Sequence, residues 1–152
     1  MSKLNLGCGN DYKEGYINVD IGNCKKDLEH DLEIFPYPFI DNQFSQVIMI
    51  HCIEHISREK LPLLAKELHR ITIPNGQIYI EAPYYLSKNA FTDFTHKNFM
   101  TEDTFGYFDK NHQLRELGKI YGIDFEFAVE VRLDRDRLDP EANVRYSLSP
   151  LK

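Results

Sequence analysis

The feature that most constrains this chain is an apolar strand, close to the N-terminus, that breaks into two glycines. Leu4-Asn5-Leu6 runs into Gly7-Cys8-Gly9, and a second apolar run, 16–19, ends at Asp20. Glycines at such a turn let the backbone approach a ligand closely, because they carry no side chain. A carboxylate at the end of the next strand can bind both hydroxyls of a ribose. The pattern therefore predicts a site for a ligand that contains a nucleoside.

The spacing of this motif argues against a dinucleotide. A dinucleotide fingerprint has a third glycine and an acidic residue about 20 residues further on. Here Asn10-Asp11-Tyr12 follows the second glycine, and the acid arrives early, at Asp20. The alternative for Gly7 and Gly9 is an ordinary tight turn, and Asp20 alone could cap a turn.

Apolar runs typical of strands alternate with an amphipathic helix, in which Leu61, Leu64, Ala65 and Leu68 form one stripe. A loop with Asp139-Pro140 joins the last two strands, which indicates an antiparallel hairpin. We predict one α/β domain over 1–152, with a Rossmann-like, mostly parallel sheet and a C-terminal antiparallel hairpin. Strands are expected at 3–6, 16–20, 28–32, 46–50, 77–80, 124–133 and 144–148, a turn at 74–76, and helices at 57–70 and in two pieces over 101–121.

The first two connections are unusually short. About nine residues separate the first two strands and about eight the next two, whereas a parallel crossover with a helix needs about a dozen. We therefore expect reduced helices after the first two strands and one thinly covered face of the sheet. That face is expected to be covered by the C-terminal segment, or by a second subunit in a homodimer.

Composition excludes several classes of partner. The chain has 18 basic and 24 acidic residues and a formal net charge of -6, which argues against nucleic acid. No apolar run approaches the length of a membrane span, and no signal peptide precedes Leu4, so no membrane partner is expected. Three cysteines without framework spacing predict a reduced, cytoplasmic protein.

Five segments, taken in order, resemble the class I S-adenosylmethionine-dependent methyltransferases, and in particular small, type-11-like members with short early crossovers. Some of those members occur in glycan or sugar modification. The segments are Leu4-Asn5-Leu6-Gly7-Cys8-Gly9, 15–20, 38–48, His51-Cys52-Ile53-Glu54-His55-Ile56 and 70–77.

The resemblance implies S-adenosyl-L-methionine as the cofactor and a role for each matching position. The glycine turn would approach the methionine part, with carbonyls near Gly7 and His51 holding its ammonium group. Asp20 would bind the ribose and Asp31 the adenine amino group, while two apolar side chains stack on the ring. The implied cofactor-binding residues are Leu6, Gly7, Cys8, Gly9, Asp20, Ile21, Asp31, Leu32 and His51.

The acceptor is expected beyond the carboxyl ends of the strands, beside the irregular segment that follows 77–80. This segment carries Asp93-Phe94-Thr95-His96. We predict His96 as a general base that deprotonates a hydroxyl, with Asp93 orienting it. The alternative is that both side chains cap turns.

His51-Cys52-Ile53-Glu54-His55 also spells H-x-x-E-H, a metalloprotease signature. That signature needs both histidines on one continuous helix, whereas His51 directly follows an apolar strand. The alternative is that Glu54 and His55 cap and orient the next helix, so no metal is expected.

These observations predict a methyltransferase that acts on a small-molecule or sugar acceptor, at oxygen. The alternative, from another class, is a cofactor-binding partner subunit without catalytic activity of its own.

Overall fold

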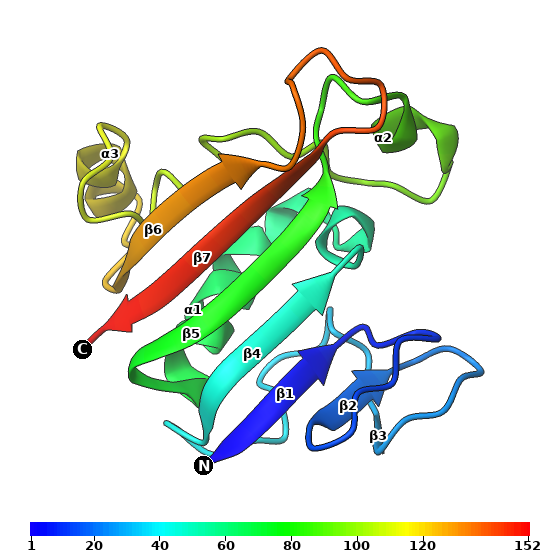
Figure 1. Ribbon diagram of the computed structural model, residues 1–152. Coiled ribbons are helices and arrows are strands. Elements are labelled where there is room, and N and C mark those ends of the chain that lie inside the picture. The colour runs from blue at the N-terminus through cyan, green and yellow to red at the C-terminus, as the bar shows by residue number, and fades with distance from the viewer.

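The computed structural model describes residues 1–152 and contains one seven-stranded sheet (Figure 1). The order across the sheet is β3-β2-β1-β4-β5-β7-β6. The first five strands pair in parallel, whereas β7 is antiparallel to both β5 and β6. The predicted Rossmann-like sheet and C-terminal hairpin are thus confirmed. The strands are β1 (Ser2–Leu6), β2 (Ile17–Asp20), β3 (Leu28–Glu29), β4 (Phe44–Ile50), β5 (Thr72–Pro83), β6 (Glu126–Leu133) and β7 (Asn143–Leu151).

The core lies on one face of the sheet, where helix α1 (Leu61–Ile71) packs behind β4 and β5 (Figure 1). Side chains alternate between the two faces of a strand, and neighbouring strands are in register. Leu4 pairs with Val47, for example, and both are fully buried. The α1 stripe that the sequence predicts meets this face through Leu64, Ala65 and Leu68, all buried. Periodicity therefore located the helix and its buried side correctly.

The helix begins later than the predicted residue 57. Two short 3-10 turns, η1 (Ile53–His55) and η2 (Arg58–Lys60), precede it. Pro62 lies in the first turn of α1, where its missing N–H would have had no intrahelical partner. The regular helix therefore begins at Leu61, with the proline in its first turn.

The prediction of two helical pieces over 101–121 is mostly wrong. Only α3 (Arg115–Ile120) is α-helical, and turns occupy 102–108. Side chains there take up backbone amides: Thr104 Oγ1 accepts from Thr101 N at 2.9 Å, and Asp109 Oδ1 accepts from Asn111 N at 3.1 Å. Such local hydrogen bonds compete with helical ones. Gly122, with φ at 80°, ends the segment as predicted.

Two further boundaries differ from the sequence prediction. Strand β3 has only two residues, and β5 extends well beyond 77–80 at both ends. The predicted turn at 74–76 is a bulge inside β5, because Phe44 pairs with Thr72 and Gln46 already pairs with Gln77. The loop after β5 contains an unpredicted helix, α2 (Lys88–Thr92), whose N-terminus is capped by the side chain of Ser87.

The first three connections between strands contain no helix at all, as the short spacing predicted for two of them. The first loop is held instead by the fully buried side chain of Asn18. Its Oδ1 accepts hydrogen bonds from Lys13 N and Asn5 Nδ2, both at 2.9 Å. Its Nδ2 lies 3.0 Å from the carbonyls of Lys13 and Tyr16 and from Asp27 Oδ2. One amide thus satisfies backbone groups that a helix would have paired internally.

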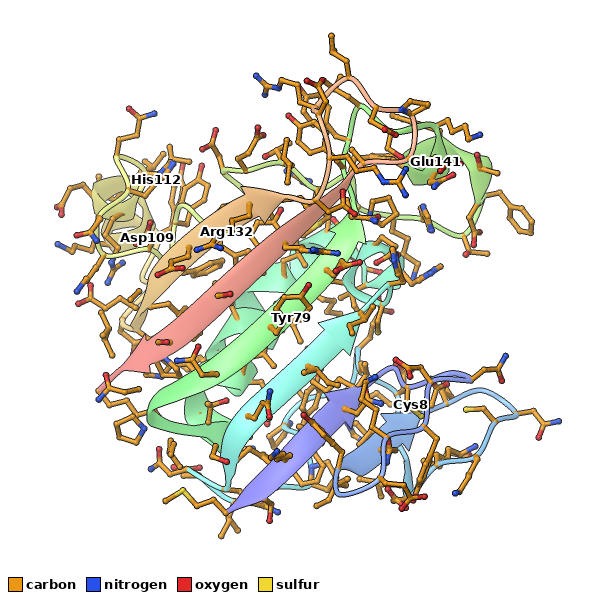
Figure 2. All side chains as sticks on the ribbon, viewed as in Figure 1. Cys8, Tyr79, Asp109, His112, Arg132 and Glu141 are labelled. Atoms are coloured by element: carbon orange, nitrogen blue, oxygen red, sulfur yellow. The ribbon has the colours of Figure 1, made fainter.

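The face of the sheet opposite α1 carries no helix (Figure 1). Figure 2 shows Tyr79 and Arg132 on this open face, on β5 and β6. The C-terminal segment does not cover the open face, because β6 and β7 join the sheet and extend it. That part of the prediction is wrong: a hairpin pairs its backbone groups best by adding to a sheet edge. No helix of the chain is long and apolar enough to cross a bilayer.

Replacing Asn18 with alanine is expected to lower the free energy of unfolding by about 2–4 kcal/mol, because buried polar groups lose their partners. Urea denaturation measures the change. Asn23→Ala, at an exposed position, is the matched control and should change stability by no more than about 0.5 kcal/mol. Equal effects of the two substitutions would show that the first loop does not depend on Asn18.

Candidate cofactor and acceptor site

A pocket of about 460 Å³ opens at the carboxyl ends of β1, β2 and β4. This is where an open parallel sheet binds its ligand, and the volume lies in the usual range for small-molecule sites. The lining residues are Gly7, Gly9, Asp20, Ile21, His30, Asp31, Leu32, Glu33, His51, Cys52, His55, Ile56 and Lys97.

The glycine turn brings bare backbone to this pocket. Gly7 has φ at 65°, and its amide donates to Val19 O at 2.8 Å. A Cβ at Gly7 would overlap the Sγ of Cys52, so no other residue fits there. Gly9 has φ at 47°, and a Cβ built on it meets nothing within 4 Å. Gly7 is therefore required by packing, whereas Gly9 keeps the pocket open.

Asp20 ends β2 at the rim of the pocket with a fixed carboxylate. Its Oδ2 accepts from Gly9 N at 2.8 Å, and its Oδ1 accepts from Gly22 N at 2.6 Å. Each carboxylate oxygen offers two lone pairs, so further acceptor positions remain. The two amides thus hold Asp20 in an orientation in which it can still accept hydrogen bonds from a vicinal diol.

Asp31 and Leu32, in the loop after β3, line the same pocket. The Oδ1 of Asp31 accepts from Glu33 N at 2.9 Å, which fixes its side chain in a tight turn. Leu32 is 7% exposed, whereas Ile21, which also lines the pocket, is 64% exposed. An apolar ring between these two side chains would bury Ile21 from water.

Two predicted residues do not line the pocket with their side chains. Leu6 is fully buried in the core, and Cys8 is 3% exposed. The Sγ of Cys8 donates to Lys25 O at 3.6 Å, and burial raises the pKa of this thiol to about 11. Cys8 therefore stays protonated and is no nucleophile, so any contact of Leu6 or Cys8 with a ligand is through the backbone.

His51 follows β4 in a backbone conformation that is rare for a residue with a side chain, with φ at 49°. Its amide donates to Glu81 O at 2.8 Å. Its ring lies between two carboxylates, with Nδ1 3.5 Å from Glu54 Oε1 and Nε2 3.7 Å from Glu81 Oε1. The proximity of Glu54 raises the pKa of His51. Such local strain is common at functional sites.

A second pocket, of about 330 Å³, adjoins the first and shares His51 and His55 with it. Apart from one proline, polar or charged side chains line this second pocket. The lining residues are His51, Glu54, His55, Pro83, Asn89, Thr92, Asp93 and His96.

Asp93 and His96 lie together in the second pocket, but they do not form a direct hydrogen bond. The distance from Asp93 Oδ2 to His96 Nε2 is 3.8 Å. His96 Nδ1 instead donates to Ala90 O at 2.9 Å. Asp93 Oδ1 accepts from both the amide and the hydroxyl of Thr95, at 2.8 and 2.6 Å, and the Thr95 hydroxyl lowers the pKa of Asp93. Asp93 thus also makes the contacts of a turn cap, which was the alternative to a role in catalysis.

Several residues at the site were not predicted from the sequence. Glu33 accepts from Ser57 N and lies 3.3 Å from Lys97 Nζ, so this ion pair forms part of the lining of the first pocket. The pair joins the loop after β3 to the segment after α2. Neither loop has a periodic pattern, so nothing in the sequence indicates this contact.

The H-x-x-E-H signature does not form a metalloprotease helix. His51 follows the last residue of β4, and His55 ends the 3-10 turn η1, as the position after an apolar strand predicted. The two rings therefore do not share a helical face.

The two glycines of the turn allow a test of these packing arguments. Gly7→Ala is expected to lower the midpoint of urea denaturation more than Gly9→Ala does. Both substitutions place a side chain on backbone with a positive φ, which costs about 1–2 kcal/mol more than glycine does there. Only Gly7→Ala also adds an overlap with Cys52. A Gly9→Ala protein less stable than the Gly7→Ala protein would contradict this assignment.

The comparisons with known proteins fit this geometry. A family model described as "Methyltransferase domain" matches residues 8–80. No curated protein matches the chain significantly. Solved structures with a similar fold include a SAM-dependent methyltransferase from Archaeoglobus fulgidus, with a TM-score of 0.67 and 17% identity over 97% of this chain and 86% of that one.

Two further structures have the same fold. A putative methyltransferase in complex with the Trm112 methyltransferase activator, from Haloferax volcanii, has a TM-score of 0.65 and 13% identity over 99% of this chain and 83% of that one. The N-methyltransferase NodS from Bradyrhizobium japonicum has a TM-score of 0.62 and 9% identity over 99% of this chain and 86% of that one.

The first pocket brings together bare glycine backbone, the carboxylate of Asp20 and the apolar side chains of Ile21 and Leu32. The family model and the sheet order agree with the resemblance seen in the sequence. Residues 8–80 thus match a methyltransferase domain, and the whole chain has the fold of S-adenosylmethionine-dependent methyltransferases, consistent with the type-11-like resemblance seen in the sequence.

Proposed function

We propose that the chain transfers the methyl group of S-adenosylmethionine to an oxygen of a small hydroxylated acceptor, such as a sugar. The observation that carries this proposal is the polar second pocket, which shares His51 and His55 with the cofactor pocket. Many hydrogen-bonding side chains around a small volume suit a ligand rich in hydroxyls.

Exposed aromatic residues near this pocket also support a sugar acceptor. Phe91 and Phe94 are 65% and 97% exposed, in the same segment as Thr92 and Asp93 of the pocket lining. The ring of Phe91 stacks on Phe99, with 4.6 Å between centroids. A sugar presents an apolar face as well as hydroxyls, so it can use aromatic rings beside a polar pocket.

When bound, the cofactor supplies a methyl group that is already activated by the sulfonium charge. The residues of the chain have to hold the acceptor oxygen in line with that methyl group and promote the loss of its proton. We assign the second task to His96 and Asp93, which both line the second pocket. Backbone contacts to the cofactor would come from Leu6, Cys8 and the two glycines. Side-chain contacts would come from Asp20, Asp31, Ile21 and Leu32.

Titration with S-adenosylhomocysteine tests the cofactor part of this proposal. The wild-type protein should bind it, and Asp20→Asn should bind at least about tenfold more weakly, because hydrogen bonds to a charged group are worth about 1.5–3 kcal/mol. Asp11→Asn, at an exposed carboxylate paired with Lys13, is the control and should bind like wild type. A wild-type protein that does not bind S-adenosylhomocysteine would refute the proposed site.

The same titration, combined with turnover on a panel of sugars and other hydroxylated compounds, tests the acceptor part. His96→Ala should lose about 100-fold or more in turnover, the usual contribution of proton removal, while its affinity for S-adenosylhomocysteine stays unchanged. Near-normal turnover would remove His96 from the chemistry. Tight cofactor binding without turnover by the wild type would favour the alternative, a partner subunit without its own activity.

We also propose that a second copy of the chain covers the open face of the sheet. This face carries both signs of charge, with Glu130 and Arg132 on β6 and Glu81 and Arg145 on adjacent strands. A patch with both signs can pair with its own copy across a two-fold axis. The Haloferax volcanii methyltransferase binds an activator, so a different partner is the competing occupant.

Light scattering should therefore give the mass of a dimer. Arg132→Glu should shift the protein toward the monomer, because it makes the β6 patch acidic on both copies. Lys88→Glu, on α2 away from this face, serves as the control and should not change the mass. A monomer at every concentration would exclude the second copy as the occupant.

A further inference from the structure

The second pocket contains a group of side chains that the methyl-transfer chemistry alone does not explain. Glu54 and His55 lie in the turn η1, and His96 lies beyond α2, some forty residues later. A carboxylate oxygen of Glu54 and one ring nitrogen from each histidine all lie within 4.8 Å of one another. Two imidazoles and a carboxylate are a donor set that holds divalent transition metals.

Glu54 is the most unusual member of this group. Its side chain is 3% exposed, and its Oε2 has no hydrogen-bond partner. The Oε1 atom lies 3.5 Å from His51 Nδ1. A carboxylate buried with an oxygen left unpaired is costly. A bound cation at this position would remove that cost.

His96 is oriented as metal-binding histidines usually are. Its side chain is 7% exposed. Its Nδ1 lies 2.9 Å from the carbonyl oxygen of Ala90, which can only accept, so Nδ1 carries the proton. In the neutral ring, the Nε2 atom therefore presents its lone pair. A backbone carbonyl on the other ring nitrogen is a common second contact of a metal-binding histidine.

A similar argument fixes the tautomer of His55. The hydroxyl of Thr95 donates its one proton to Asp93 Oδ1, at 2.6 Å. The same hydroxyl oxygen lies 3.0 Å from His55 Nδ1, so Nδ1 must be the donor of that hydrogen bond. In the neutral ring of His55, the Nε2 atom then presents its lone pair as well. The rings of His55 and His96 lie edge to face, with centroids 4.8 Å apart.

We propose that Glu54, His55 and His96 bind a zinc-type divalent metal ion in the acceptor pocket. Ligands about 2.0–2.2 Å from a metal lie roughly 3.3 Å from each other in a tetrahedral site, so the three groups need to move closer by no more than about 1.5 Å. Three protein ligands leave one position open, as in catalytic sites.

The open position gives the metal a role that rests on the proposed function. A hydroxyl bound to a divalent metal has a lowered pKa, so an acceptor hydroxyl there can lose its proton to water. The resulting oxygen then forms a bond to the methyl carbon as the bond from that carbon to the cofactor sulfur breaks. In this arrangement His96 promotes deprotonation as a metal ligand, and Asp93 positions His55 through Thr95.

The sequence did not predict this site, because the H-x-x-E-H spacing directs attention to His51 and His55 on one helix. In the structure the carboxylate, His55 and the distant His96 come together, and His51 lies beside Glu54. Because about forty residues separate His55 from His96, a search for short sequence motifs cannot find their proximity.

Titration of untagged, metal-free protein with Co²⁺ and Zn²⁺ tests the site independently of activity. Cobalt absorption and calorimetry should show one ion per chain for the wild type. Glu54→Gln, His55→Asn and His96→Asn should each weaken binding at least about tenfold, as expected for lost metal ligands. His112→Asn is the control: it removes another histidine–carboxylate pair, with Asp103, and lies beside α3, away from α2 (Figure 2).

S-adenosylhomocysteine affinity, measured on the same samples, shows whether each variant retains the cofactor pocket. Absence of metal binding by the wild type would overturn the proposal, and so would wild-type metal affinity in all three ligand variants. If Glu54→Gln does not fold, the two histidine variants still decide the outcome. Metal binding without S-adenosylhomocysteine binding would refute the proposed function and leave the metal site standing.

Discussion

The hydrogen bonds of buried Asn18 are the interaction on which the rest of the structure depends. The first connection between strands is too short for a helix, so its backbone groups need other partners. Asn18 provides them for Lys13 and Tyr16, and it joins the first strand through Asn5. The glycine turn lies between these contacts, so its position relative to β2 is fixed. The alignment of Gly9 N with Asp20 follows from that position.

Replacing helices by a polar network has two consequences for function. No helix N-terminus lies beneath the glycine turn, so a cofactor in the first pocket would meet loop backbone, the Asp20 carboxylate and Leu32 instead. The same lack of helices leaves one face of the sheet open, where Tyr79 and Arg132 project (Figure 2). The chain therefore combines a pocket at the strand ends with an uncovered sheet face, and both features arise from the same short loops.

Strands and sheet direction were predictable because each is encoded locally, whereas the cofactor side of the site stays a prediction. Apolar runs mark the strands, and Gly7, Gly9 and Asp20 mark the first two strand ends. The turns before α3 were mistaken for helix because side chains such as Thr104 and Asp109 bind backbone amides, a choice that depends on tertiary context. The Glu33–Lys97 pair could not be found for a similar reason, since a contact between two distant loops leaves no periodic signal.

The second pocket, where the proposed function places the acceptor, is preorganised by contacts to the turn that follows β4. The carbonyl of Glu54 accepts from Lys97 N at 2.7 Å and from Asn98 N at 3.0 Å, and Asn98 Nδ2 donates to Ile56 O. These hydrogen bonds attach the segment that carries His96 to the segment that carries His51 and His55. Polar groups from separate loops are thus held in place before any acceptor binds. Because little ordering is left for the bound state, more of the binding energy remains for aligning acceptor and methyl group.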